Sequence, residues 1–207
     1  MARPSQAKKR EAILDAATEL FLESGYSRVS VDAIVAKVGG SKRTIYAYFG
    51  DKDGLFSALI SHLCQKHVAP LVSLDLIGLA PDHALRKMAD AFFDVLLAPH
   101  TLELHRLVVA ESPHFPDAGR AFFAAAPSIS YRCLSDYFAW AENEGLIKPG
   151  SAYNRARLFL DSLTGDIQLR CLLGLVDEPD KERLRALSDE AIDIFLDGIG
   201  YRRDDPA

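Results

Sequence analysis

The stretch that decides the fold lies near the N-terminus, at residues 30–56, and reads SVDAIVAKVGGSKRTIYAYFGDKDGLF. Ser30 is a good N-cap for a short helix over residues 31–38, because its hydroxyl can accept a backbone N–H of the first turn. Gly39-Gly40 ends that helix, and Ser41 caps a second one. Two short helices joined by a glycine turn form the helix-turn-helix pattern, in which the second helix enters the major groove of DNA.

The second short helix carries the side chains that such a role needs. Lys42 and Arg43 lie in its first turn, where long cationic side chains can reach guanine acceptors or phosphates. Hydroxyls and free backbone N–H groups at the helix starts favour phosphate. Each residue alone is common as a cap or on a solvated face, so their joint occurrence carries the prediction. The predicted DNA-binding residues are Ser30, Ser41, Lys42, Arg43, Thr44, Tyr46, Tyr48 and Lys52.

The rest of the 207-residue chain also has helical periodicity, and no stretch alternates as a half-buried strand does. We therefore predict an all-α fold of about nine helices. Residues 1–53 would form a three-helix DNA-binding domain, and residues 54–207 a helical ligand-binding and dimerisation domain. The expected helices span residues 7–24, 31–38, 42–48, 52–67, 82–97, 101–111, 115–141 (with a kink at Pro127), 153–175 and 180–198.

Charge is distributed unevenly along the chain. Residues 1–53 contain nine Lys and Arg against seven Asp and Glu, whereas residues 54–207 contain 15 against 22. The first ten residues carry Arg3, Lys8, Lys9 and Arg10 and no acidic residue. A basic head on an acidic body predicts that any contact with a polyanion lies at the N-terminus.

Several classes of protein are disfavoured by the same sequence. No apolar run approaches the roughly 18 residues of a membrane span, and the N-terminus lacks the apolar stretch of a signal peptide. The three cysteines, Cys64, Cys133 and Cys171, form no CxxC pair, so we expect no metal, no cofactor and a cytoplasmic protein. No GxSxG, HExxH, P-loop or GxGxxG motif is present, which disfavours an enzyme.

Residues 7–56 resemble the DNA-binding domain of the TetR/AcrR family of one-component regulators. The resemblance runs from the first amphipathic helix through Phe21, Gly25 and Tyr26, and then along the quoted stretch to Leu55-Phe56. It implies that the hydroxyls of the serines and tyrosines among the predicted DNA-binding residues, and the ammonium of Lys52, hold phosphates. It also implies that Lys42, Arg43 and Thr44 are the base readers, with Tyr46 as a further candidate, and that the basic arm before Glu11 contacts the minor groove or the flanking backbone.

Two positions depart from the usual pattern of the family. Val35 stands where a small alanine is common, and Gly40 stands where a valine usually fills the turn. Both changes would loosen the packing between the two short helices, but neither removes a group that faces DNA.

The C-terminal body resembles the family in fold, and residues 106–116 (RLVVAESPHFP) are similar to an AefR-like subgroup of repressors. The helix over residues 153–175 is apolar on two sides, so both sides need a cover. Leu160, Leu163, Ile167 and Cys171 form one side; Leu158, Leu169 and Leu172, with Ser162 and Gly165, form the other. The last helix has a matching stripe at Leu187, Ala191, Ile194, Phe195 and Ile199. We predict a homodimer through the last two helices, the alternative being a fully buried helix in a monomer.

The expected function is that of a repressor, released from a palindromic operator in double-stranded DNA by a small hydrophobic effector. A helical small-molecule carrier is the alternative, although a carrier would not need the cations and tyrosines of the head. The aromatic residues of the middle region would mostly form core, and polar groups among them could orient a ligand. The candidate effector-binding residues are Phe93, His105, Glu111, Arg132, Asp136, Tyr137 and Trp140.

Overall fold

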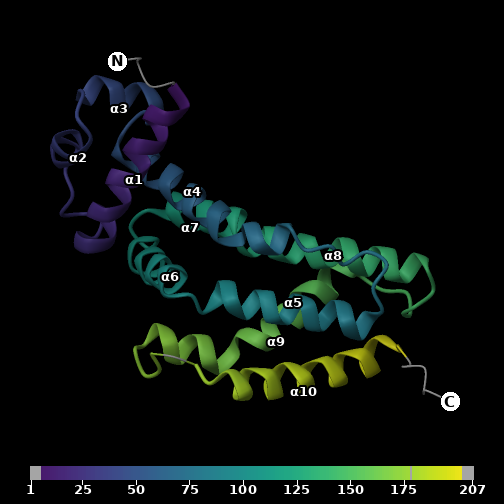
Figure 1. The fold of residues 1–207 in the computed structure, drawn as a ribbon. Helices are drawn as coiled ribbons and strands as arrows, with labels where there is room; N and C mark the ends of the chain where they lie inside the picture. The colour runs from purple at the N-terminus through teal and green to yellow at the C-terminus, as the bar shows by residue number, and fades with distance from the viewer. Residues whose placement is uncertain (1–5, 178, 202–207) are drawn as a thin grey trace. The chain divides into compact units, whose positions relative to one another are not determined.

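The computed structural model describes residues 6–177 and 179–201, which contain helices and turns and no strand (Figure 1). The predicted all-α fold is confirmed for these residues. Arg3 of the basic N-terminal arm and the tail after Tyr201 lie outside them. The helices are α1 (Gln6–Ser24), α2 (Val31–Val38), α3 (Lys42–Phe49), α4 (Lys52–Val72), α5 (Pro81–Leu96), α6 (Pro99–Glu111), α7 (Pro116–Ala125), α8 (Pro127–Asn143), α9 (Ala152–Leu172) and α10 (Lys181–Ile199).

Three of the predicted helices differ from the structure by more than two residues at one end or by a break. Helix α4 continues through Pro70 to Val72, because the proline lies so near the helix end that only the last turn loses a hydrogen bond. The expected kink at Pro127 is a full break between α7 and α8, with Ala126 outside helical geometry. Gly165 breaks α9, since its φ of 23° and ψ of −127° are not helical.

The chain packs as two compact units. The first consists of Met1–Lys66 and Glu103–Ala126, and the second of His67–Leu102 and Pro127–Ala207. The chain therefore passes from one unit to the other within α4, within α6 and between α7 and α8. The predicted boundary after residue 53 separates DNA binding from ligand binding and dimerisation, not one packing unit from the other, and it stays a prediction.

The first unit has a core that α1 to α4 share with α6 and α7. Phe21, Ile34 and Ile45 are fully buried, one from each of the first three helices, and they pack in one cluster with Phe56 of α4 and Leu104 of α6. The helices predicted to bind DNA are thus held on a hydrophobic base that includes the segment Glu103–Ala126.

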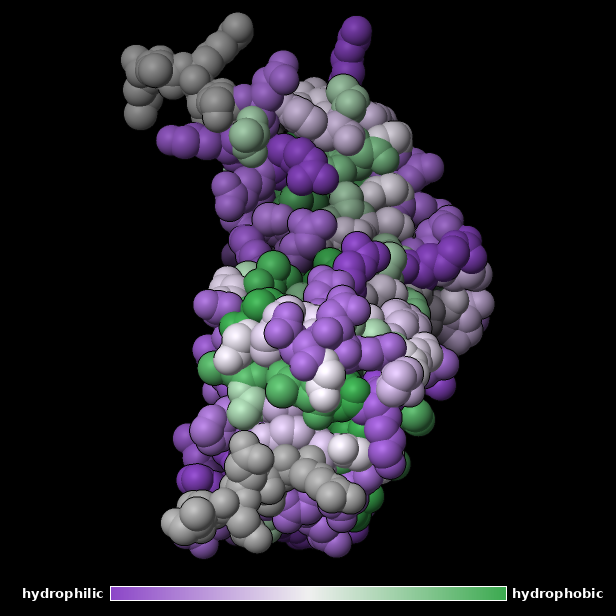
Figure 2. Space-filling model, turned by 90° about the vertical axis from the view of Figure 1, so that its right-hand side faces the viewer, coloured by the Kyte–Doolittle hydropathy of each residue, from purple (hydrophilic) through white to green (hydrophobic). Residues whose placement is uncertain are grey.

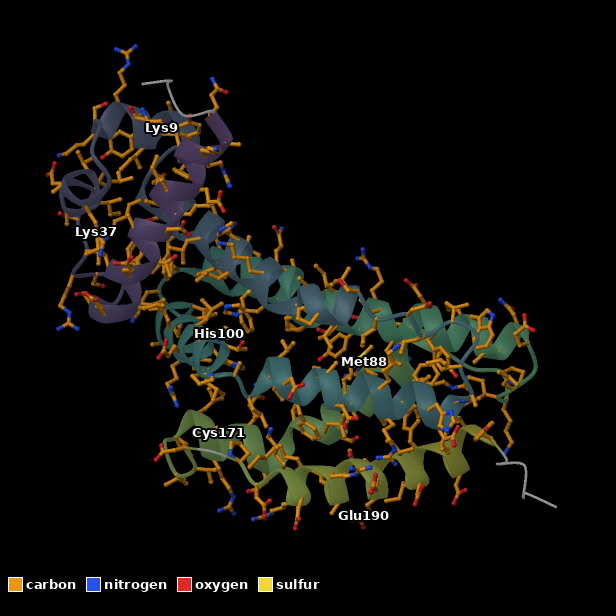
Figure 3. The ribbon with its side chains drawn as sticks, viewed as in Figure 1. Lys9, Lys37, Met88, His100, Cys171 and Glu190 are labelled. Carbon is orange, nitrogen blue, oxygen red and sulfur yellow. The ribbon has the colours of Figure 1, made fainter. Side chains whose placement is uncertain are left out.

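The second unit is a helical bundle around a larger apolar cluster. Met88 of α5, Phe138 of α8, Phe159 of α9 and Ile192 of α10 meet in it, while Glu190 projects away from α10 (Figure 3). Hydrophobic side chains also interrupt the hydrophilic surface in the space-filling view (Figure 2). The exposed large apolar residues of α9 and α10 are Tyr153, Leu158, Leu169, Leu187 and Ile194.

Candidate nucleic-acid interface

Helices α2 and α3 begin at the predicted caps. The Ser30 hydroxyl accepts the backbone N–H of Ala33 at 3.1 Å, and the Ser41 hydroxyl accepts that of Thr44 at 3.3 Å. Between the helices, Gly39 has a φ of 76° and donates its N–H to the carbonyl of Val35, which ends α2. The sequence therefore folds here into two capped short helices with a glycine turn, and the predicted helix-turn-helix geometry is confirmed.

Helix α3 is held by one face and exposed on the other. Ile45 is 1% exposed in the core of the unit, whereas Tyr46 is 44% exposed and Lys42 and Arg43 lie at the surface. Thr44 is half-buried, with its hydroxyl 3.1 Å from the Ser41 hydroxyl. The first turn of α3 thus presents two cations and two hydroxyls, groups that can bind base edges and phosphates.

The two cations differ in their surroundings. The Lys42 ammonium lies 2.8 Å from the Asp32 carboxylate of α2, and the hydrogen bond and charge of Asp32 raise the pKa of Lys42. Arg43 has no ion pair with any described residue. A contact between Lys42 and DNA would require Lys42 to exchange Asp32 for DNA, whereas Arg43 has no such ion pair to give up within the described residues.

Lys52 and Tyr48 are, like Thr44, only partly exposed. The Lys52 ammonium lies 4.0 Å from the centroid of the Tyr26 ring, and burial lowers its pKa, against the opposing effect of the Asp53 and Glu111 carboxylates. Tyr48 is half-buried, with its ring 6.0 Å from that of Phe49. Both residues therefore have packing roles in addition to any contact with DNA.

The basic start of α1 lies beside the glycine turn. Lys8, Lys9, Ile13, Val38 and Gly40 are among the residues that line a hollow of about 410 Å³, and nothing lies within 4 Å of where a Cβ at Gly40 would be. Because residue 40 is glycine, where the family usually has valine, space remains at the turn. Figure 3 marks Lys9 on α1 and Lys37 on α2, and Lys37 forms an ion pair with Glu19.

Sequence reasoning missed the residue that joins these helices, Tyr26. Its hydroxyl donates to the Asp53 carboxylate, and its backbone N–H donates to Oε1 of Glu111 at 3.0 Å. Its ring centroid lies 3.9 Å from that of Phe115. Its ring also packs on that of Phe21, with the ring centroids 5.8 Å apart.

The candidate effector-binding residues are divided between the two units. His105 and Glu111 belong to the first unit and the other five to the second. The His105 ring lies 5.2 Å from that of Phe122, and burial lowers the pKa of His105. Glu111 is engaged with the backbone of Tyr26.

In the second unit, three of the candidates meet at one hollow. Arg132, Asp136 and Tyr137 of α8 line a space of about 470 Å³ together with apolar side chains of residues 71–77. The Tyr137 hydroxyl already donates to the carbonyl of Leu79 at 3.0 Å. Phe93 lines a different hollow of about 410 Å³, and the Trp140 ring packs 5.6 Å from the Tyr137 ring.

Two family models match the chain, one for each end. Residues 13–59 match the model described as "Bacterial regulatory proteins, tetR family". Residues 83–200 match the model described as "AefR-like transcriptional repressor, C-terminal domain". The chain belongs to the TetR family.

Individual TetR-family relatives match over most of their length. The repressor Rv3405c of Mycobacterium tuberculosis is 37% identical over 162 residues, which is 75% of this chain and 80% of the relative. The regulator YuxN of Bacillus subtilis is 22% identical over 96% of this chain and 67% of its own. Among solved structures, the Flavonoid-responsive Regulator FrrA has a TM-score of 0.82 and 30% identity, covering 93% of this chain and 97% of its own.

Membership of the TetR family decides between the alternatives weighed from the sequence. The members are DNA-binding transcriptional regulators and not enzymes, so the chain is a transcriptional regulator and neither an enzyme nor a plain carrier. Within residues 6–177 and 179–201, no helix has both the length and the apolar character needed to cross a bilayer.

Proposed function

We propose that this TetR-family chain is a cytoplasmic repressor that leaves a palindromic operator when a small hydrophobic effector binds. The observation that carries the proposal is the first turn of α3, where Lys42 and Arg43 are exposed while Ile45 is fixed in the core. A helix that is held in the core by one face and exposes cationic side chains at its start has what reading of the major groove requires.

The DNA contacts divide into two kinds. Lys42, Arg43 and Thr44 read base edges, since they occupy the first turn of α3. The other predicted contacts hold phosphates and set the register without reading sequence; they are Ser30, Ser41, Tyr46, Tyr48 and Lys52. The capping hydroxyls remain available for this, because a hydroxyl that accepts one hydrogen bond can still donate another.

The functional unit is a homodimer through α9 and α10. Leu158 is 56% exposed on α9 and Ile194 is 68% exposed on α10, while Leu160 and Leu163 on the opposite side of α9 are buried in their own unit. Ile199, predicted as part of the dimer stripe, is also buried. A second copy would cover the exposed leucines and isoleucine. The two recognition helices of the dimer, one from each copy, would meet half-sites about 34–36 Å apart.

The effector is a small and mostly apolar molecule. The hollow at Arg132, Asp136 and Tyr137 has a mostly apolar lining with three charged residues, Asp75, Arg132 and Asp136, the usual make-up of a ligand site. The name of the relative FrrA, a flavonoid-responsive regulator, supports a response to a ligand of this kind. Release needs an effector that prefers the non-binding arrangement, and a coupling of about 1–3 kcal/mol weakens operator binding about 5–150-fold.

A selection from random double-stranded DNA at physiological salt tests the proposal. The wild-type protein should enrich a palindrome, and a variant with Lys42, Arg43 and Tyr46 all changed to Ala should not. Salt-sensitive binding without enrichment, shared by the variant, would contradict specific reading. An enriched operator that no effector from an apolar small-molecule set releases would contradict the proposed switch.

A further inference from the structure

Tyr26 lies at the centre of the first unit, although it occupies a turn. It follows α1 directly and is 5% exposed. Its ring lies 4.9 Å from that of Phe56 in α4 and 3.9 Å from that of Phe115, just before α7. Tyr26 is therefore in contact with three separate segments of the chain, and its position depends on all of them.

The face of this ring carries Lys52. An ammonium 4.0 Å from the centroid of a tyrosine ring is held by the electron density of the ring face. The Tyr26 hydroxyl donates to the Asp53 carboxylate, which draws the hydroxyl proton away and makes the ring face more negative. The ammonium has three N–H donors, so Lys52 can lie on Tyr26 and still donate to a phosphate.

Glu111 fixes Tyr26 from the other side. Its Oε1 accepts the Tyr26 backbone N–H at 3.0 Å. A Cβ at Gly25, where φ is +75°, would lie 3.3 Å from the same oxygen, so glycine permits this close approach. The backbone carbonyl of Glu111 accepts the N–H groups of His114 and Phe115 at 3.0 and 2.9 Å. One residue at the end of α6 thus holds both the backbone of Tyr26 and the turn that places Phe115 on its ring.

We propose that Glu111 and Tyr26 are positioning residues that hold Lys52 in place for its contact with a DNA phosphate. The inference rests on the proposed function, because that function assigns the phosphate contact to Lys52. Glu111 is the last residue of α6, a helix whose first residues belong to the second unit. A shift of this helix would move Tyr26 and thereby Lys52, so the phosphate contact is sensitive to the state of α6.

The first test measures the position of Lys52 without DNA. Lysines are dimethylated with ¹³C-formaldehyde, and the Lys52 signal is assigned by its absence in Lys52→Arg. In the wild type, the ring of Tyr26 should shift this signal upfield. Glu111→Ala should return it to the ordinary lysine position, and Glu111→Gln should restore the shift, because its amide oxygen still accepts the Tyr26 N–H. An unshifted wild-type signal, or one that Glu111→Ala leaves in place, would overturn the inference.

The second test measures the salt dependence of binding to a mixed-sequence duplex of 30 base pairs. The slope of log affinity against log salt is negative, and loss of one phosphate contact lowers its magnitude by about 0.9. Glu111→Ala and Lys52→Ala should each lower the magnitude of the slope by about that amount for each DNA-binding domain in contact with the duplex. The slope of the double variant should equal that of Lys52→Ala. The control is Glu103→Ala, which removes the same charge from the exposed side of α6 and should leave the slope at the wild-type value.

The outcomes separate the inference from the function on which it rests. If Lys52→Ala lowers the slope and Glu111→Ala does not, or if the two losses add, Glu111 does not position Lys52. Tighter binding by Glu111→Ala would mean that Tyr26 withholds Lys52 from DNA, which also overturns the inference. If Lys52→Ala itself leaves the slope unchanged, the phosphate role assigned to Lys52 fails, and the inference fails with it.

Discussion

Lys42 and Arg43 are neighbours in α3, yet their side chains meet different partners. Lys42 is bound to Asp32, whereas Arg43 has no ion pair within the described part of the chain. Lys42 gives up its pair with Asp32 when it binds DNA, and the loss of this exposed pair offsets part of what the new contact contributes. We therefore expect Arg43 to contribute more to base reading than Lys42.

Substitutions at Arg43 and Lys52 separate base reading from phosphate binding. Arg43→Ala should cost about 1–3 kcal/mol on the preferred sequence and relax the preference at particular bases. Lys52→Ala should weaken binding to every sequence by a similar factor and flatten the salt dependence. Affinities for the selected operator and its single-base variants measure both effects, with Lys37→Ala, whose lysine pairs with Glu19, as the control. Equal and sequence-independent losses from both variants would contradict the division.

At the same scale, the sequence predicts what depends on near neighbours. The capping by Ser30 and Ser41 is local, so spacing alone was sufficient to predict it. The bond between Tyr26 and Glu111 joins residues 85 positions apart, and no local pattern records which distant helix end meets a turn. Glu111 was predicted as an effector contact because it is a polar group among apolar neighbours; that role stays a prediction, and its bond to the backbone of Tyr26 is a contact that the local pattern did not indicate.

Among the elements, α9 contains a break that its apolar pattern conceals. Gly165 has a φ of 23° and a ψ of −127°, which a residue with a Cβ rarely adopts, and it lies beside a hollow of about 290 Å³ between α9 and α10. The sequence predicted a continuous helix because the heptad-like spacing of leucines runs past the glycine. The C-terminal ends of helices were predicted correctly where glycine or proline comes soon after the last helical residue. Gly39 follows the end of α2 at Val38, and Pro113 lies two residues after the end of α6 at Glu111.

Two glycine substitutions test the break with matched geometry. Neither Gly165 nor Gly198 has an atom within 4 Å of where a Cβ would lie, but Gly198 is not at positive φ. Gly165→Ala should destabilise the fold by about 1–3 kcal/mol, through backbone strain. Gly198→Ala should stabilise it by about 0.4–1 kcal/mol, through the unfolded chain. Urea unfolding at one fixed protein concentration measures both, and a stabilising Gly165→Ala would show that α9 is continuous in solution.

For the whole molecule, the exposed apolar surface of α9 and α10 is where we predict that two copies of the chain meet. Leu158→Glu or Ile194→Glu should convert a dimer to a species of one 22.8 kDa chain, because each places a charge in an apolar interface. Val109→Glu, at an equally exposed position on α6, should leave the dimer intact. Light scattering after gel filtration measures the mass. A dimer that survives both substitutions on α9 and α10 would place the interface elsewhere.

The division of the chain into units could be predicted only in part. The charge asymmetry and the helix-turn-helix pattern predicted a separate head, but not that Glu103–Ala126 packs with it. That packing depends on Leu104, Leu107 and Val108, which have the same apolar pattern as any core helix. Sequence periodicity indicates that a face is buried, and the partner of that face is decided by the tertiary fold.

The most direct test of the account is the affinity of the wild-type protein for its selected duplex, divided by its affinity for a scrambled duplex of equal composition at physiological salt. We predict a ratio of at least about 1,000, as is typical of specific DNA readers. The same ratio should fall toward one in the variant with Lys42, Arg43 and Tyr46 changed to Ala, because the variant should lose far more affinity for the selected duplex than for the scrambled one. A wild-type ratio near one would contradict the claim that α3 reads DNA.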